Sequence, residues 1–511
     1  MRIIQTLKNS IYAIFSYIIL LVLALLVRKV FLMELPIELL GYEGLFGNVF
    51  ALLALADLGI ESLILYRMFP SFANDNHNEI NKNMAVYKLL YKYIGIAIIF
   101  MGIALIPFLK YIVTGNNLDW KYVYTIYFVQ LITTLCTYFL AYKRLMFTVS
   151  QQEFECTKVD TAVSTLFNLI KIIVLLLFES YILYLLCNLA INLISNIIIS
   201  IKVDRKFVFF NSGQKATIGD IKQLGMGKEI RDNLVQKVSG TIYGGTDNIV
   251  ASALLGISCV GLMANYSLIG GYVTNFINKL LRPFQMAIGN HIYSSDKDEG
   301  YELFRMFDYI SYIIASTVAT CYLCLFNPFI ELWIGQDFLL CNAFVVAFAL
   351  NQYVLWNHQF LCYYRYSFGG YELDKYPILV AAIVNVMFSV VLCKPLGIAG
   401  IMIGTLVGQL GFWIGRIRVV YSLYIKKETV KKYVFRQMIR LIIFISELYA
   451  SWIVCGLIPV SVVGVVARLF IAMAVPVLTN IIVFCGTQEM KTIKCYVKKT
   501  LNVVKNRVDK L

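Results

Sequence analysis

Long apolar runs constrain this chain more than any other feature of its sequence. Each is near 20 residues long, and a helix of that length rises about 30 Å, the hydrocarbon thickness of a bilayer. We therefore predict an all-α polytopic membrane protein with about 14 transmembrane helices. The predicted spans are 11–33, 44–66, 93–113, 121–142, 159–178, 180–201, 232–255, 258–282, 309–333, 341–363, 376–396, 400–424, 437–457 and 460–486.

The composition agrees with this class. Of 511 residues, 59% are hydrophobic and 15% are charged, and the mean hydropathy is +0.74. Soluble globular domains are closer to half apolar and a quarter charged. The composition therefore argues against a soluble globular protein.

The formal net charge of +15 is distributed in alternate loops. Lysine and arginine collect in loops such as 202–231 and 426–436, whereas the intervening loops are nearly bare. The positive-inside rule then predicts cytoplasmic N- and C-termini and an even number of spans. Because topology explains the basic surplus, we expect no nucleic-acid partner.

The loop lengths predict a division of the chain. The longest internal loop, 202–231, separates six spans from six, which predicts an N-lobe (1–201) and a C-lobe (232–425) around a central cavity. An extra helix pair (426–486) follows. The basic tail (487–511) can form an amphipathic helix on the inner leaflet.

Polar residues interrupt the apolar stretch from Lys237 to Tyr266. Wound as a helix, Lys237, Thr241 and Asn248 share a face, with Asp247 at its border. A carboxylate in a span costs roughly 2.5–3.5 kcal/mol on insertion scales and usually faces a bundle interior or a watery cavity. The small residues of this face equally suit close helix packing, and both interpretations stay open.

Three more spans contain charges. Asp57 and Glu61 lie one turn apart in the second span, and Lys171 lies midway along the fifth. Asp57 is predicted to face a cavity or to form an ion pair, for which Lys171 is a candidate partner. Arg28 lies near the outer end of the first span.

The eighth span places Asn275, Lys279 and Arg282 along one face. These cations could hold an anionic headgroup at the cytoplasmic mouth of a cavity. They could equally reach the phosphates of bulk lipid, and the sequence does not decide between the two.

Signatures of enzymes are missing from the sequence. There are three histidines, and no phosphate-binding loop, dinucleotide fingerprint or zinc-protease motif. The 12 cysteines follow no metal-binding pattern. We expect a transporter without a cofactor, with H⁺ or Na⁺ as the candidate coupling ion.

Two stretches resemble bacterial polysaccharide flippases of the Wzx type, which translocate O-antigen and capsule repeat units. The first begins RKVFLMELPIELLGYEGLFGNVFALLALADLGIESLILYRMFP at Arg28, and the second is GGTDNIVASALLGISCVGLMANYSLI in spans seven and eight. GNHIYS at 289–294 fits the family's exit from span eight. The similarity covers spans one to three and seven to eight, whereas the last four spans match only in hydropathy.

The resemblance implies membership of the MOP superfamily, which includes MATE antiporters and lipid II flippases, and transport by alternating access. The implied substrate is an undecaprenyl-diphosphate-linked oligosaccharide repeat unit, moved from the cytoplasmic to the outer leaflet of the bacterial inner membrane for O-antigen, capsule or exopolysaccharide biosynthesis. Membrane lipids and the polysaccharide polymerase machinery are the implied partners. Arg28, Asp57 and Asp247 match family positions. We expect Arg28, with Lys279 or Arg282, to contact the diphosphate.

Two other functions remain as alternatives. A MATE-like cation-coupled multidrug antiporter would be expected to carry an acidic ion site in span one, but that span has no carboxylate before Glu34. A membrane polysaccharide polymerase or ligase would need a substantial external loop with catalytic residues, and no external loop exceeds roughly a dozen residues.

Overall fold

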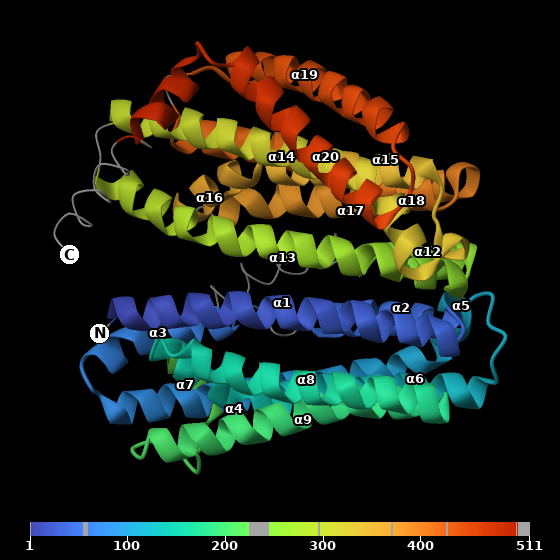
Figure 1. Cartoon of the computed structure of the whole chain (residues 1–511). Helices are drawn as coiled ribbons and strands as arrows, with labels where there is room; N and C mark the ends of the chain where they lie inside the picture. The colour runs from blue at the N-terminus through green and yellow to red at the C-terminus, as the bar shows by residue number, and fades with distance from the viewer. Residues whose placement is uncertain are drawn as a thin grey trace. The chain divides into compact units, whose positions relative to one another are not determined.

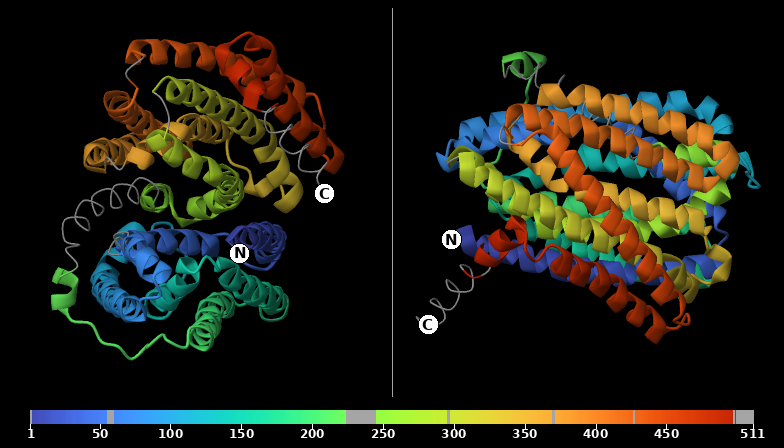
Figure 2. Two further views of the ribbon diagram at one scale, coloured as in Figure 1. Left: turned by 90° about the vertical axis from the view of Figure 1, so that its left-hand side faces the viewer. Right: turned by 90° about the horizontal axis from the view of Figure 1, so that it is seen from above.

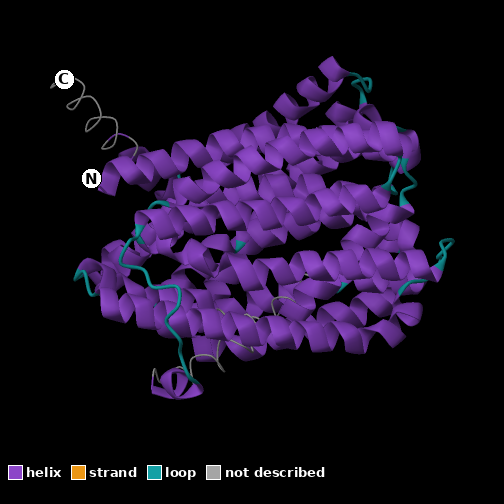
Figure 3. Cartoon of the chain, turned by 90° about the horizontal axis from the view of Figure 1, so that it is seen from below, coloured by secondary structure: helices purple, strands orange, loops and turns teal. Residues whose placement is uncertain are grey.

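The computed structural model describes residues 2–54, 60–223, 245–294, 297–368, 371–425, 428–496 and 498. These residues are almost entirely helical, and no strand occurs among them (Figure 3). The prediction of an all-α polytopic membrane protein is confirmed. The chain divides into two compact units, Met1–Ala264 and Asn265–Leu511.

The first unit is a bundle of long helices. Helix α8 packs against both α1 and α9, while α6 packs against α9 and α4 (Figure 1). Their apolar faces enclose a core that includes Phe31, Leu45 and Tyr127, each with 0% exposure. The helices are α1 (Arg2–Glu34), α4 (His77–Leu105), α6 (Trp120–Leu140), α7 (Arg144–Val149), α8 (Glu153–Phe178), α9 (Tyr181–Lys206) and α10 (Ile218–Gln223).

The second predicted span is built from α2 (Glu38–Leu53) and α3 (Ile60–Ala73), with residues 55–59 outside the described part. Helix α12 (Asp247–Leu255) packs on α2 and on the short α5 (Leu109–Ile112). It therefore belongs to the first unit by packing. The predicted lobes of six spans are defined by the order of the spans and not by packing, so that division stays a prediction.

Close backbone contact joins α12 and its neighbours at one end of the unit. Ile257 N donates to Thr114 O at 3.0 Å. A Cβ at Gly41 would lie 2.1 Å from Ile257 O, so this approach requires glycine. Gly256 separates α12 from α13 (Ile257–Ser294). Its φ of +99° is a backbone conformation that residues with a side chain rarely adopt, so glycine is favoured at this position.

The second unit contains most of α13 and the helices that follow it (Figure 2). Helices α17 and α18 form its most extensive pair because Gly400, Gly404 and Gly408 recur every four residues along α18. A Cβ at Gly404 would lie 2.3 Å from Ser389 N, so these small residues let the backbones approach closely. The helices are α14 (Lys297–Ile334), α15 (Asn342–Asn357), α16 (Gln359–Phe368), α17 (Tyr371–Leu396), α18 (Ile398–Leu423), α19 (Val430–Gly456) and α20 (Val462–Val483).

Within the described residues, 11 helices are long and apolar enough to cross a membrane. The three other predicted spans account for the difference from 14. Spans 44–66 and 232–255 include undescribed residues, whereas 341–363 consists of two shorter helices, α15 and α16, joined at His358. Hydropathy does not reveal this break, because both halves are apolar.

Candidate functional site

The first unit buries a group of charged and aromatic residues that we call the Arg28–Lys171 cluster. It consists of Arg28 of α1, Glu43 of α2, Lys171 of α8, and Tyr181 and Tyr184 of α9. These residues meet because α8 packs between α1 and α9. The cluster contains two residues predicted from the sequence and one carboxylate that was not.

Lys171 is the most deeply placed cation of this cluster, with 5% exposure. Its ammonium donates to Asn168 Oδ1 at 3.2 Å and lies 4.9 Å from the Tyr184 ring centroid. Glu43 and Arg28 both act on it electrostatically, the first favourably and the second unfavourably. A buried ammonium is thus stabilised by an amide, an aromatic face and a carboxylate.

Aromatic packing fixes the geometry around these charges. The Tyr181 and Tyr184 rings stack with centroids 5.9 Å apart, and both meet Phe31 edge-on. Phe31 lies one turn beyond Arg28 on α1, so the same packing positions the guanidinium. The rings exclude solvent and strengthen the local electrostatics.

Several polar atoms of the Arg28–Lys171 cluster are buried without a hydrogen-bond partner. They are Arg28 Nη1, Glu43 Oε2 and Tyr181 OH. A buried polar group without a partner costs about 1–3 kcal/mol, more when charged. Two cations also face one carboxylate, so the cluster carries an excess of positive charge. The arrangement can accept an anionic group, with a carboxylate and a phenol to bind hydroxyls.

Glu43 was missed because the sequence offers only a weak signal for it. It lies in LLGYEGLF, at the border of the predicted second span, where a carboxylate is easily solvated. Asp57, the predicted partner of Lys171, lies outside the described residues. The only signal for Glu43 was an acid directly before the apolar run GLFGNVF.

Glu61 is exposed and lines a small cavity of about 190 Å³ in the first unit. Tyr87, Tyr91 and Tyr138 form part of its wall, with Arg144. Arg144 is held by Asp160 through two hydrogen bonds of 2.8 Å. This cavity is separate from the Arg28–Lys171 cluster in its lining residues.

The stretch from 237 to 266 is described only from residue 245. Asp247 is the first residue of α12, where a carboxylate is favourable next to the helix N-terminus. Asn248 Nδ2 donates to Gly44 O of α2 at 3.3 Å. Asn248 therefore serves helix packing. Lys237 and Thr241 lie outside the described residues.

On α13, Asn275 and Lys279 are both exposed, and their role at a cavity mouth stays a prediction. The side chain of Arg282 lies outside the described part of the protein. Lys29, next to Arg28, is also exposed.

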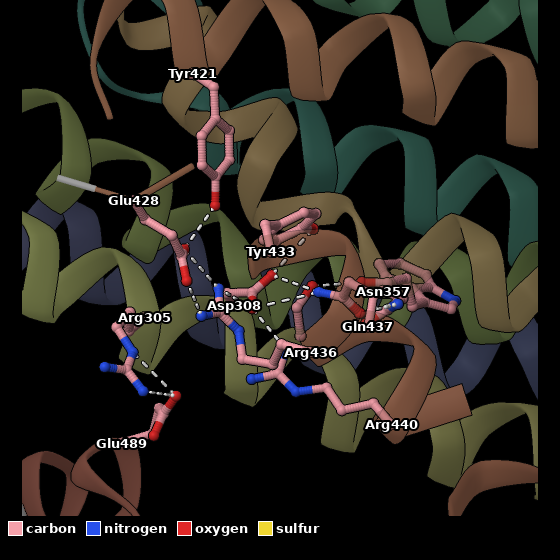
Figure 4. A network of polar contacts seen from close by, with 12 residues as sticks. Arg305, Asp308, Asn357, Tyr421, Glu428, Tyr433, Arg436, Gln437, Arg440 and Glu489 are labelled. Carbon is pink, nitrogen blue, oxygen red and sulfur yellow. Dashed lines mark hydrogen bonds and ion pairs between the residues drawn. The ribbon is translucent and has the colours of Figure 1, made fainter. Parts of the chain in front are cut away.

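The second unit contains a different kind of charge group, which we call the Asp308–Arg440 network (Figure 4). Arg440 Nη1 lies 2.5 Å from Asp308 Oδ2, and Arg436 Nη1 lies 2.6 Å from Glu428 Oε1. Arg436 also lies 3.7 Å from Asp308, and Gln437 donates to the same carboxylate. Two arginines thus face two carboxylates.

Neutral donors complete this network. Tyr433 OH donates to Asp308 at 3.3 Å, Tyr421 OH donates to Glu428 at 2.8 Å, and Asn357 Nδ2 donates to Gln437 at 3.0 Å (Figure 4). The network therefore joins α14, α15, α18 and α19. Its charges balance, which favours a structural role.

No protein-family model and no curated protein matches this sequence. Solved structures do match. A lipid II flippase, MurJ, in an inward closed conformation has a TM-score of 0.63 at 14% identity, covering 93% of this chain and 98% of the other. An inward-facing multidrug resistance MATE family transporter of the MOP superfamily has a TM-score of 0.57 at 14% identity, covering 82% of this chain and 100% of the other.

These similarities establish the fold. The chain is a multi-pass membrane protein with the fold of MOP-superfamily transporters. More particularly, it resembles both the lipid flippase and the multidrug transporter of that superfamily.

Proposed function

We propose that this protein is a flippase that moves undecaprenyl-diphosphate-linked oligosaccharides from the cytoplasmic to the outer leaflet of the bacterial cytoplasmic membrane. The observation that carries the proposal is the Arg28–Lys171 cluster, with its excess of positive charge and unpartnered buried atoms. A diphosphate is an anionic group that arginine can bind through two parallel hydrogen bonds.

A lipid substrate has a precedent in this fold, because one of the structural neighbours is a lipid II flippase. Translocation of a polar headgroup through lipid is slow because its desolvation is costly, and a polar path lowers that barrier.

In the proposed mechanism, Arg28 contacts the diphosphate while Lys171 raises the local positive potential from behind it. Glu43 and Tyr181 accept and donate hydrogen bonds to the first sugar. Lys279 and Arg282 receive the headgroup at the cytoplasmic side, and Asp57 and Asp247 set the electrostatics of the path. The sugars move by alternating access of the two lobes.

The alternative is a MATE-like, cation-coupled multidrug antiporter, favoured by the second structural match. The absence of a carboxylate before Glu34 in α1 weighs against it. The excess of positive charge around Arg28 also disfavours the cationic drugs that such antiporters would carry.

Reconstituted vesicles test the proposal. Purified protein is inserted with a short polyprenyl-diphosphate oligosaccharide, and a membrane-impermeant glycosidase reports how much sugar reaches the outside. A parallel assay follows efflux of a cationic dye. Glycolipid movement without dye movement supports the flippase, whereas dye movement alone overturns it.

The matched pair Arg28→Ala and Lys29→Ala locates the site. Arg28 contributes to the buried cluster and Lys29 is exposed, although the two are adjacent in sequence. We expect loss of translocation only in Arg28→Ala. Equal activity of the two variants would contradict the assignment of the site.

A further inference from the structure

A second buried carboxyl group lies where the last helix pair meets the second unit. Glu447 lies about two-thirds of the way along α19, and the residue is 1% exposed. Helices α14, α19 and α20 pack pairwise around it. We call this group the Glu447 seam; its members, each buried to 1% exposure or less, are Ser316 and Thr320 of α14, Glu447 and Ser451 of α19, and Asn480 of α20.

One oxygen of Glu447 has a clear donor. Asn480 Nδ2 donates to Glu447 Oε1 at 2.8 Å and approaches Ser316 Oγ at 3.4 Å. Tyr309 OH donates to the backbone carbonyl of Asn480 at 2.9 Å, which holds α20 in place. The amide of Asn480 is therefore aimed at the carboxyl group.

Other oxygens of the Glu447 seam have no partner. Glu447 Oε2, Asn480 Oδ1 and Ser451 Oγ are buried without a hydrogen bond. Ser451 lies one turn beyond Glu447 on the same face of α19. A proton on Glu447 Oε2 would supply the donor that Asn480 Oδ1 lacks and that the Ser451 hydroxyl can also accept.

The charged and titratable groups around Glu447 do not neutralise it. From α19, Arg440 lies two turns away and is engaged by Asp308 at 2.5 Å. From α14, Tyr309 and Tyr312 interact electrostatically with the carboxyl group, and from α15 Tyr353 does so. Tyrosines are neutral at ordinary pH. Among the described residues, no cation lies within ion-pair distance of Glu447.

An ionised Glu447 would therefore be a buried charge without a counter-ion, which costs several kcal/mol. A proton removes that charge without needing any volume, whereas a metal ion needs a shell of oxygen ligands. The close burial of every member of the seam favours the proton.

We propose that Glu447 is a proton-binding site that controls the packing of α19 and α20 on α14. The protonated acid is packed as in this structure, and loss of the proton draws water into the seam and loosens it. The site stands independently of the transported substrate; if the proposed function holds, proton exchange here accompanies the transport cycle.

A cavity lies near the Glu447 seam, beyond the next turn of α14 and α19. Cys324 and Cys455 lie one turn beyond Thr320 and Ser451, and they contact each other's helices in the same seam. Both also line a cavity of about 490 Å³ whose wall includes Glu331 and Arg468. Water that enters the cavity is thus separated from Glu447 by about two helical turns.

Infrared difference spectroscopy tests protonation directly. The full-length protein is titrated with base in detergent, and the carbonyl stretch of a protonated carboxylic acid is compared in wild type and Glu447→Gln. We expect a band at neutral pH that wild type loses at high pH and that the variant lacks. The same spectra from wild type and variant would overturn the proposal.

Cysteine labelling tests the link to packing. A membrane-permeant maleimide is applied over a pH series, and each cysteine is read by mass spectrometry. Cys455 is 2% exposed and lies one turn beyond Ser451 of the Glu447 seam, whereas Cys393 is 1% exposed on α17 and serves as an internal control. Glu447→Gln mimics the protonated acid at every pH. Its labelling therefore measures how much the reactivity of the thiol itself rises with pH.

We expect labelling of Cys455 in wild type to rise above the Glu447→Gln baseline by up to about ten-fold per pH unit once the acid begins to ionise, with Cys393 unchanged. Equal pH dependence in the two proteins would contradict the proposed switch. If added Na⁺ protects Cys455 from labelling at high pH, the site binds a sodium ion instead of a proton and the assignment is overturned. Neither readout uses a glycan, so failure of the flippase assay leaves both interpretable.

Discussion

The Arg28–Lys171 cluster and the Asp308–Arg440 network are both buried charge groups, but they differ in how their charges are balanced. In the second unit, two arginines face two carboxylates at distances down to 2.5 Å, and tyrosine and amide donors fill the remaining positions. In the first unit, two cations face one carboxylate, and Arg28 Nη1, Glu43 Oε2 and Tyr181 OH have no partner.

We interpret the balanced network as structural and the unbalanced cluster as the binding site of the proposed flippase. A balanced network stabilises the contact between helices but leaves nothing for a ligand to bind. An unbalanced cluster with unpartnered polar atoms lowers the stability of the folded protein, and such a loss of stability is typical of binding sites. Substitutions in the Asp308–Arg440 network should therefore lower the stability of the protein. Substitutions in the Arg28–Lys171 cluster should instead lower its transport activity.

The largest effect is expected for Asp308→Ala. It leaves Arg440, which is 1% exposed, as a buried charge without its carboxylate. Removal of one partner of a buried pair costs about 3–5 kcal/mol. The free energy of unfolding in detergent should fall by that amount. The double variant Asp308→Leu/Arg440→Met should recover much of the loss, and a double variant as unstable as the single one would contradict the ion-pair explanation.

Arg28→Ala should have the next largest effect, on translocation and not on folding. Loss of a charged hydrogen bond of about 1.5–3 kcal/mol predicts a decrease of about 10- to 100-fold in the initial rate in reconstituted vesicles. Because Arg28 Nη1 has no protein partner, the unfolding midpoint should stay close to wild type. A large fall in stability would place Arg28 with the structural network instead.

Lys171→Met gives a smaller effect of the same kind. Methionine has a similar length and removes a buried charge that the cluster balances only in part. Stability should be unchanged or higher, because replacing a buried charge with a packed apolar side chain is often neutral or stabilising. Translocation should fall less than in Arg28→Ala. A loss of stability would indicate that Glu43 and Lys171 form a structural pair.

The sequence predicted the fold more completely than either charge group. Apolar runs of membrane-spanning length located the spans. The predicted loop between the seventh and eighth spans lies at Gly256, whose positive φ breaks the helix there. The break at His358 was not foreseen because hydropathy records composition and not backbone continuity. The lobe boundaries stay a prediction.

The charge groups were harder to predict because their partners come from distant helices. Arg28 and Lys171 were recognised singly, since a charge in a span is unusual. Their shared contact with Glu43 depends on how α1, α2, α8 and α9 pack, which no single span reveals. Asp308 and Arg440 lie at or near the ends of predicted spans, where a charged residue is not unusual and gives no signal of its own.

The smallest effect is expected at the edge of the second unit, where Arg305 and Glu489 form a partly exposed pair. Arg305 donates to Glu489 Oε1 at 2.7 and 3.1 Å, and their side chains are 28% and 5% exposed. Glu489 lies beyond the last span. Burial alone would raise its pKa, but hydrogen bonds from its own backbone and from Arg305 outweigh burial and hold the pKa below the ordinary value of 4.5.

A carboxyl group whose pKa is depressed by folding stabilises the protein above its unfolded pKa, and that contribution is lost as the pH falls through the folded value. Glu489→Gln should therefore lower the free energy of unfolding by about 1 kcal/mol at neutral pH, and the difference from wild type should shrink below pH 4.5. Unfolding midpoints of both proteins across that range provide the measurement. A constant difference would mean that Glu489 acts through packing and not through its charge.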